Sequence, residues 1–160
     1  IIIEVMTNNK NRAASEIRTI FSKNGGNLAE TGSVSYNFKK YGNIVIENKN
    51  LDEKDFFDFA VENGSIEVDS NNNNFSVLCE VTDYHNLIDK FTKKFAQPKE
   101  MKIIWHNNNV VEIDYETTKK LFKLINSLEE NEDVQNVFSN FHVNDEIINK
   151  LKIEEEINAW

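Results

Sequence analysis

Apolar positions recur at strand and helix spacings from the first residue onward. Residues 1–6 are almost continuously apolar, which is typical of a central strand. Apolar side chains then recur every three or four positions, which predicts a helix over residues 9–24. Asparagines before it can cap its free amides, and Gly25-Gly26 can end it in the left-handed conformation. The residues that share its apolar face are Ala14, Ile17, Ile20 and Phe21.

The pattern continues as an alternation of strands and helices. Asn50, with Glu53 three residues later, predicts a capping box for a second helix. Asp83 or Thr82 opens a third helix, and Asp114 caps a fourth. We expect a turn over residues 39–42 and further strands over residues 33–38, 43–47, 65–69, 75–81, 102–105, 110–113 and 134–143. A short helix can form through Ile147, Ile148 and Leu151, with fraying from Lys152 onward.

This order predicts an α+β protein with two ferredoxin-like α/β sandwiches, one inserted into the other. Each sandwich follows the βαββαβ order, which right-handed crossovers make geometrically ordinary. The inserted domain is expected over residues 41–107. The discontinuous domain combines residues 1–40 with 108–145, and residues 146–160 form an acidic C-terminal tail.

Charge is distributed unevenly along the 160 residues. Residues 1–45 hold six Lys or Arg and three Asp or Glu, a net charge of +3, whereas the whole chain carries −9. An acidic surface repels phosphates, so any nucleic-acid contact is expected in the basic N-terminal third. The bland alternative, that acidity only keeps the protein soluble, explains most of the acidic residues.

The turn that opens the first helix is the strongest functional candidate. Free amides and the helix dipole favour an anion there, and cationic side chains add to the attraction. We therefore predict phosphate contacts from Lys10 and Arg12, with Arg18 and Lys23 farther along the helix. The alternative is a solvated helix start capped by asparagine, which is a common feature.

Lys39 and Lys40, placed at the tip of a hairpin, are a second candidate for phosphate binding. They can equally protect a strand edge from pairing. Tyr36 and Phe38, just ahead of them, come closest to a platform for stacking RNA bases, but core packing explains these rings as well.

Other chemistry finds little support in the sequence. His85, His106 and His142 lack metal-ligand spacing, and the single cysteine, Cys79, lies in an apolar strand. Gly25-Gly26 follows a helix and is not a phosphate loop. We therefore expect no enzyme activity, no metal and no cofactor. No apolar run approaches the roughly 18 residues that span a bilayer, so no membrane partner is expected.

Several stretches resemble the YebC/PmpR family, which includes the mitochondrial translational activator of cytochrome c oxidase. They are NNKNRAASEIR, FSKNGGNLAETGSVSYNF, GNIVI, LDEKDFFDFAVENG and KLFKLINSLEENEDVQNVFSNF. Residues 67–106 match more loosely. Family members usually begin with a basic helical domain, and residue 1 falls where the second domain starts. The resemblance therefore implies a fragment that lacks that first domain.

The resemblance also implies a role in gene expression. Family members are described as DNA-binding transcriptional regulators and as translation factors at the ribosome. The expected partner is therefore DNA or ribosomal RNA, and the ribosome itself is a further expected partner. The expected location is the cytoplasm, or the mitochondrion in a eukaryote. The competing class is an acidic protein-interaction module with no direct nucleic-acid contact.

Overall fold

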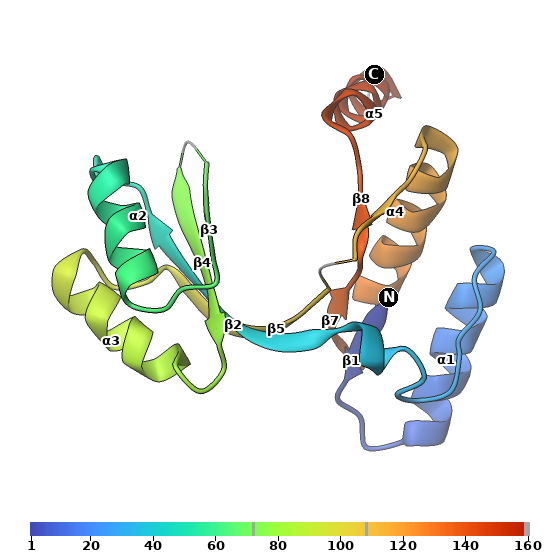
Figure 1. Cartoon of the computed structure of the whole chain (residues 1–160). Helices are drawn as coiled ribbons and strands as arrows, with labels where there is room; N and C mark the ends of the chain where they lie inside the picture. Colours follow the sequence, from blue (N-terminus) through green and yellow to red (C-terminus); the bar gives the residue numbers. More distant parts are fainter. Residues whose placement is uncertain (72, 108, 159–160) are drawn as a thin grey trace. The chain divides into compact units, whose positions relative to one another are not determined.

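The chain divides into two compact units in a computed structural model that describes residues 1–71, 73–107 and 109–158 (Figure 1). Side chains are described up to residue 152. One unit combines Ile1–Phe38 with Asn107–Trp160, and the other is Lys39–His106. The sequence places these boundaries after residues 40 and 107. We call the first the discontinuous unit and the second the inserted unit.

The inserted unit has the βαββαβ order of a ferredoxin-like sandwich. Its four strands pair in the order β3-β4-β2-β5, and every pairing is antiparallel. This is the arrangement that two crossover helices on one face of a sheet produce, and it confirms the predicted α+β class. The elements are β2 (Lys39–Glu47), α2 (Glu53–Glu62), β3 (Glu67–Ser70), β4 (Asn74–Glu80), α3 (Tyr84–Lys94) and β5 (Glu100–His106).

Both helices of the inserted unit pack on the same face of the sheet (Figure 1). Phenylalanines dominate the core between them. The Phe56 ring stacks on Phe75 with centroids 4.1 Å apart, and Phe91 lies 5.2 Å from Phe56. All three side chains are fully buried. Burial of such rings is the main favourable term for a unit of this size.

The expected turn over residues 39–42 is wrong, because these residues begin β2. Gly42 lets β2 pack closely against the ring of Tyr84, since a Cβ at this position would lie 2.3 Å from Cδ2 of Tyr84. Lys39 and Lys40 pair with β5 only, and pairing with β4 starts at Tyr41. The two lysines therefore lie on a two-stranded ribbon and not at a hairpin tip.

The discontinuous unit packs two helices on a two-stranded antiparallel sheet. The elements are β1 (Ile2–Val5), α1 (Lys10–Lys23), α4 (Tyr115–Glu129) and β7 (Val134–Phe138), and β1 pairs with β7. Ile17 and Phe21 of α1 meet Leu124 and Leu128 of α4 in its core. β6 (Val111–Glu112) pairs in parallel with β8 (Phe141–His142). This is the second sandwich-like unit.

The strand expected over residues 33–38 is wrong. A 3-10 turn, η1 (Ser35–Asn37), occupies this stretch, and the Ser35 hydroxyl donates to the Gly32 carbonyl over 2.7 Å. Gly32 has a positive φ of 81°, which places a turn where the strand was expected to start. Local hydrogen bonds thus satisfy the backbone without a partner strand. Tyr36 is consequently 82% exposed, and only Phe38 is buried.

The strand expected over residues 134–143 is two strands with different partners. β7 pairs with β1, and β8 pairs with β6. Asn140 lies between them, and its carbonyl accepts from the Val111 amide over 2.8 Å. The recurring apolar positions of residues 134–143 therefore did not reveal the change of sheet at Asn140.

Two predictions about helix ends are also corrected. Asp52, not Asn50, caps α2 by accepting from the Asp55 amide over 2.7 Å, and Asn50 adopts a φ of 60° in the preceding turn. Glu53 accepts from the Ser70 hydroxyl over 2.7 Å, so no capping box forms. At the C-terminus, α5 (Asp145–Asn158) continues past the point where fraying was expected. The cap of α4 by Asp114 is confirmed, with 2.8 Å to the Thr117 amide.

Candidate nucleic-acid interface

The helix α1 places the predicted cations on the surface of the discontinuous unit. Asn9 caps it, since its side-chain oxygen accepts from the Arg12 amide over 3.1 Å. Ala13, Ile17 and Phe21 are its buried face. This leaves the intervening polar positions exposed, and the cations among them are Lys10, Arg12, Arg18 and Lys23.

Three of these cations keep their charge available. Within the described part of the chain, Lys10, Arg18 and Lys23 form no ion pair, and all three are exposed. An exposed cation that has no carboxylate beside it can neutralise a phosphate without first breaking an internal contact. These three residues therefore form the cationic surface of α1.

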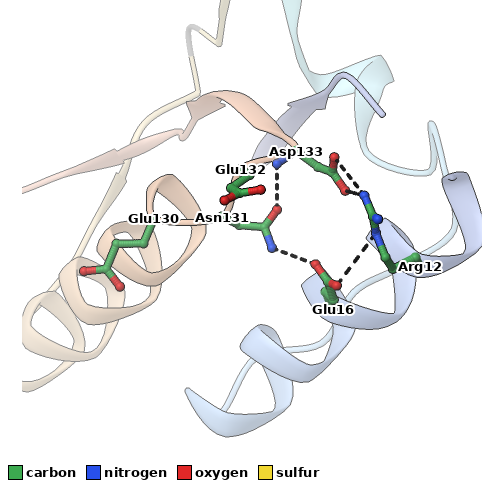
Figure 2. Close-up of a pocket in the computed structure, with 6 residues that line it drawn as sticks. All are labelled: Arg12, Glu16, Glu130, Asn131, Glu132 and Asp133. Carbon is green, nitrogen blue, oxygen red and sulfur yellow. Dashed lines mark hydrogen bonds and ion pairs between the residues drawn. The ribbon is translucent and has the colours of Figure 1, made fainter. Parts of the chain in front are cut away.

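Arg12 is held differently. Its Nη2 atom lies 3.2 Å from Oδ2 of Asp133 and donates to both carboxylate oxygens, while Nε lies 3.9 Å from Glu16 (Figure 2). The Asp133 side chain is only 14% exposed. Arg12 thus uses its charge to hold α1 against the turn between α4 and β7. Its guanidinium is therefore less available to bind a phosphate.

Hydrogen bonds extend this contact into a network. The Asn131 side chain donates to Glu16 over 3.1 Å and accepts from the Asp133 amide over 3.0 Å. The Met6 amide donates to the Asp133 carbonyl over 2.8 Å, so the residue that follows β1 joins the network as well. Figure 2 shows Arg12, Glu16, Asn131 and Asp133 converging, whereas Glu130 points away. The network explains why α1 keeps its place on the α4–β7 turn.

The same residues line an open hollow of about 370 Å³. Four carboxylates and one arginine line it, so its net charge repels phosphate. The hollow is therefore unsuited to nucleic acid, although it adjoins the N-terminal part of α1. Its lining residues are Arg12, Glu16, Glu130, Asn131, Glu132 and Asp133.

Lys39 and Lys40 point to opposite faces of the β2–β5 ribbon, as alternate strand positions do. Lys39 forms an ion pair with Glu80 over 2.6 Å, and this hydrogen bond is the main cause that raises the pKa of the Lys39 ammonium. The Lys40 ammonium lies 4.7 Å from the centre of the Trp105 ring. The Trp105 contact was missed in the sequence, since nothing local links residue 40 to residue 105.

Cys79 and the potential metal ligands form no reactive or metal-binding site among the described residues. Burial raises the pKa of the Cys79 thiol to about 11, with further contributions from Asp83 and Glu80. That thiol is fully buried and a poor nucleophile at neutral pH. Across residues 1–71, 73–107 and 109–152, no three His, Cys, Asp or Glu side chains gather as metal ligands do. In the same ranges no helix combines the length and apolarity needed to cross a membrane.

The fold and the surface define a two-unit α+β protein with a cationic helix on an otherwise acidic chain. A family model described as TACO1/YebC second and third domain matches residues 1–141. The chain therefore belongs to the TACO1/YebC family, and the predicted family resemblance is confirmed.

A solved structure agrees with this assignment. The crystal structure of a conserved hypothetical protein, Aq1575 from Aquifex aeolicus, matches with a TM-score of 0.82 and 33% identity. The match covers 91% of this chain and 60% of that chain, so this chain spans 60% of the length of its relative.

Proposed function

We propose that the protein containing this chain is a nucleic-acid-binding regulator of gene expression that acts without catalysis. The observation that carries the proposal is the set of exposed cations on α1 that pair with no carboxylate among the described residues. Membership of the TACO1/YebC family supports a regulatory role. Cationic side chains that contact phosphates position a protein on nucleic acid without reading its sequence.

Charge reversal on α1 tests the proposal. Lys10→Glu/Lys23→Glu removes two of the three unpaired cations, and Lys93→Glu/Lys152→Glu makes the same charge change at exposed positions of α3 and α5. Lys23 and Lys93 both lie in the last turn of a helix, so the pairs are matched. Fluorescence anisotropy with a labelled oligonucleotide at low salt should show a loss of roughly tenfold or more for the α1 pair. Equal losses for the two pairs would contradict a local contact.

The nucleic acid itself divides the proposal into two forms. We propose DNA, and hence transcriptional regulation, as the first form, and ribosomal RNA, and hence a translation factor, as the second. Both forms place the protein in the cytoplasm, or in a mitochondrion if the source is eukaryotic. Binding of a longer protein to promoter DNA supports the first, and its co-sedimentation with ribosomes supports the second.

An acidic protein-interaction module is the alternative that a specific observation favours. The hollow beside α1 is lined by four carboxylates, and the whole chain carries a charge of −9. Such a surface suits a cationic protein partner better than a phosphate. This alternative predicts that Lys10→Glu/Lys23→Glu leaves the binding of that partner unchanged, whereas Glu130→Gln/Glu132→Gln weakens it.

A further inference from the structure

The end of the β2–β5 ribbon brings cations and aromatic rings together on both of its faces. Lys39 lies directly opposite His106 in the register, and Lys40 lies opposite Trp105. These residues come from segments that the inserted unit's helices and strands separate along the chain. Their meeting is a property of the fold and not of a local motif.

Each face of the ribbon end carries one lysine ammonium that lies close to an aromatic ring. On one face the Lys40 Nζ lies 4.7 Å from the centre of the Trp105 ring. On the other face Lys39 Nζ lies 5.1 Å from the Tyr41 ring, which meets His106 edge-on with centroids 6.0 Å apart. Both lysines are exposed, and Trp105 and His106 are partly exposed.

The position in the sheet makes this end approachable within the inserted unit. β5 is an edge strand in the order β3-β4-β2-β5. β4 pairs with β2 only from Tyr41 onward, so it does not flank Lys39 or Lys40. Within the inserted unit, therefore, no further strand of this sheet covers the outer side of β5.

We propose that this ribbon end binds single-stranded nucleic acid that crosses the edge of β5. On one face Trp105 stacks on a base and Lys40 contacts a phosphate, and on the other face His106 and Lys39 do the same for a neighbouring nucleotide. The inference rests on the proposed function and assigns it a second contact, apart from α1. Rings next to cations are the combination that binds unpaired strands with little sequence preference. A duplex hides its base faces, so the ribbon end favours single strands.

Glu80 sets a limit on the electrostatic part of this contact. It pairs with Lys39 over 2.6 Å, so part of the Lys39 charge is already neutralised. Removing the Glu80 charge should therefore strengthen binding. Glu80→Gln keeps the shape of the side chain and leaves Lys39 its full charge for a phosphate.

Tryptophan fluorescence tests the proposal without changing the site. The chain has two tryptophans, Trp105 and Trp160, and Trp160 lies outside the described residues. In the Trp160→Phe chain, all tryptophan emission comes from Trp105. The probes are labelled 12-nucleotide oligo(U), labelled 12-nucleotide oligo(dT) and a labelled mixed-sequence RNA duplex of equal length. In each titration we measure both the anisotropy of the label and the emission of Trp105.

The proposal predicts that oligo(U) or oligo(dT) quenches Trp105 with the midpoint that anisotropy gives. The oligonucleotide that binds tighter identifies RNA or DNA as the preferred strand. The duplex should bind more weakly and leave emission unchanged. Binding of single strands with unaltered emission would overturn this site while leaving the proposed function intact. If none of the probes changes the anisotropy, both the ribbon-end site and the proposed function are contradicted.

A matched pair of substitutions adds a second test. Trp105→Leu should lower single-strand affinity at least fivefold, since one stacked base is lost. Phe122→Leu removes another partly exposed ring, on α4, and should leave affinity unchanged. Equal affinities of the Trp105→Leu and Phe122→Leu chains would overturn the proposal. Circular dichroism shows that each variant is folded before binding is compared.

Discussion

Arg12 and Asp133, which lie 121 residues apart in sequence, form an ion pair of 3.2 Å between Nη2 and Oδ2. The pair joins the first turn of α1 to the residue that precedes β7. It also removes one cation from the surface that the sequence predicts for nucleic acid. Arg12 therefore has a structural role here, and Lys10, Arg18 and Lys23 carry the proposed phosphate contact.

A double-mutant cycle with Arg12→Gln and Asp133→Asn should give a coupling energy of about 0.5–1 kcal/mol, because half-exposed ion pairs contribute little more. Urea denaturation measures each free energy of unfolding. Arg12→Gln should also lower nucleic-acid affinity less than Lys10→Gln does. A coupling energy of zero, together with a larger affinity loss for Arg12→Gln, would show that Arg12 binds phosphate after all.

Gly42→Ala should destabilise the inserted unit by about 1–3 kcal/mol, as overpacking in a core does. The added Cβ would lie 2.3 Å from Cδ2 and 2.9 Å from Cγ of Tyr84. Thermal unfolding measures the loss. Adding Tyr84→Leu should recover part of it, because the obstructing ring is gone. An unchanged midpoint for Gly42→Ala would mean that the ring moves aside easily.

Phe56→Ala should cost about 3–5 kcal/mol, since Phe56 is fully buried and stacks on Phe75. Phe122→Ala is the matched control, because Phe122 is 38% exposed and should lose far less. Urea denaturation compares the two. If the two substitutions lowered the free energy of unfolding by similar amounts, Phe56 would not be a core residue and Phe122 a surface residue, as described here.

Because of the buried Cys79 thiol, the free energy of unfolding should fall at alkaline pH. Burial raises the pKa of its thiol to about 11 in the folded chain, above the ordinary value of 9.0. Between these two values the unfolded chain loses the proton first, so its ionisation favours unfolding. The stability contribution is complete below pH 9 and is lost as the pH rises toward 11.

The measurement is the free energy of unfolding at pH 8, 9.5 and 11 for the native chain and for Cys79→Ala. The native chain should lose more stability over this range than Cys79→Ala does. Alkylation of Cys79 at pH 8 should follow global unfolding. Parallel pH curves, or rapid alkylation of the folded chain, would count against a buried neutral thiol.

The sequence predicted the features that depend on neighbouring residues. The helix α1 and the Asp114 cap follow from spacing and side-chain chemistry over a few positions, and both are present. On the apolar face of α1, however, Ala13 is buried in place of the expected Ala14. The βαββαβ order of the inserted unit follows from counting strands and helices. These features need no knowledge of distant contacts.

The errors arose where a distant partner or a local hydrogen bond decides the outcome. The alternation of Val34, Tyr36 and Phe38 indicates a strand, but the stretch pairs with no strand in the described part of the chain, and the Ser35 hydroxyl favours a turn. The Arg12–Asp133 pair and the Lys40–Trp105 contact join residues far apart in the chain. Periodicity cannot predict them, because it describes one element at a time.

The salt dependence of binding tests the central claim most directly. Affinity for a single-stranded oligonucleotide is measured between 50 and 200 mM salt, and log K is plotted against log salt for the native chain, Lys10→Gln/Lys23→Gln and Lys93→Gln/Lys152→Gln. Each phosphate contact contributes roughly −0.7 to the slope. The α1 pair should therefore flatten the slope by about 1.4, and the control pair should leave it unchanged. Equal slopes for all three chains would contradict the claim that unpaired cations of α1 hold the nucleic acid.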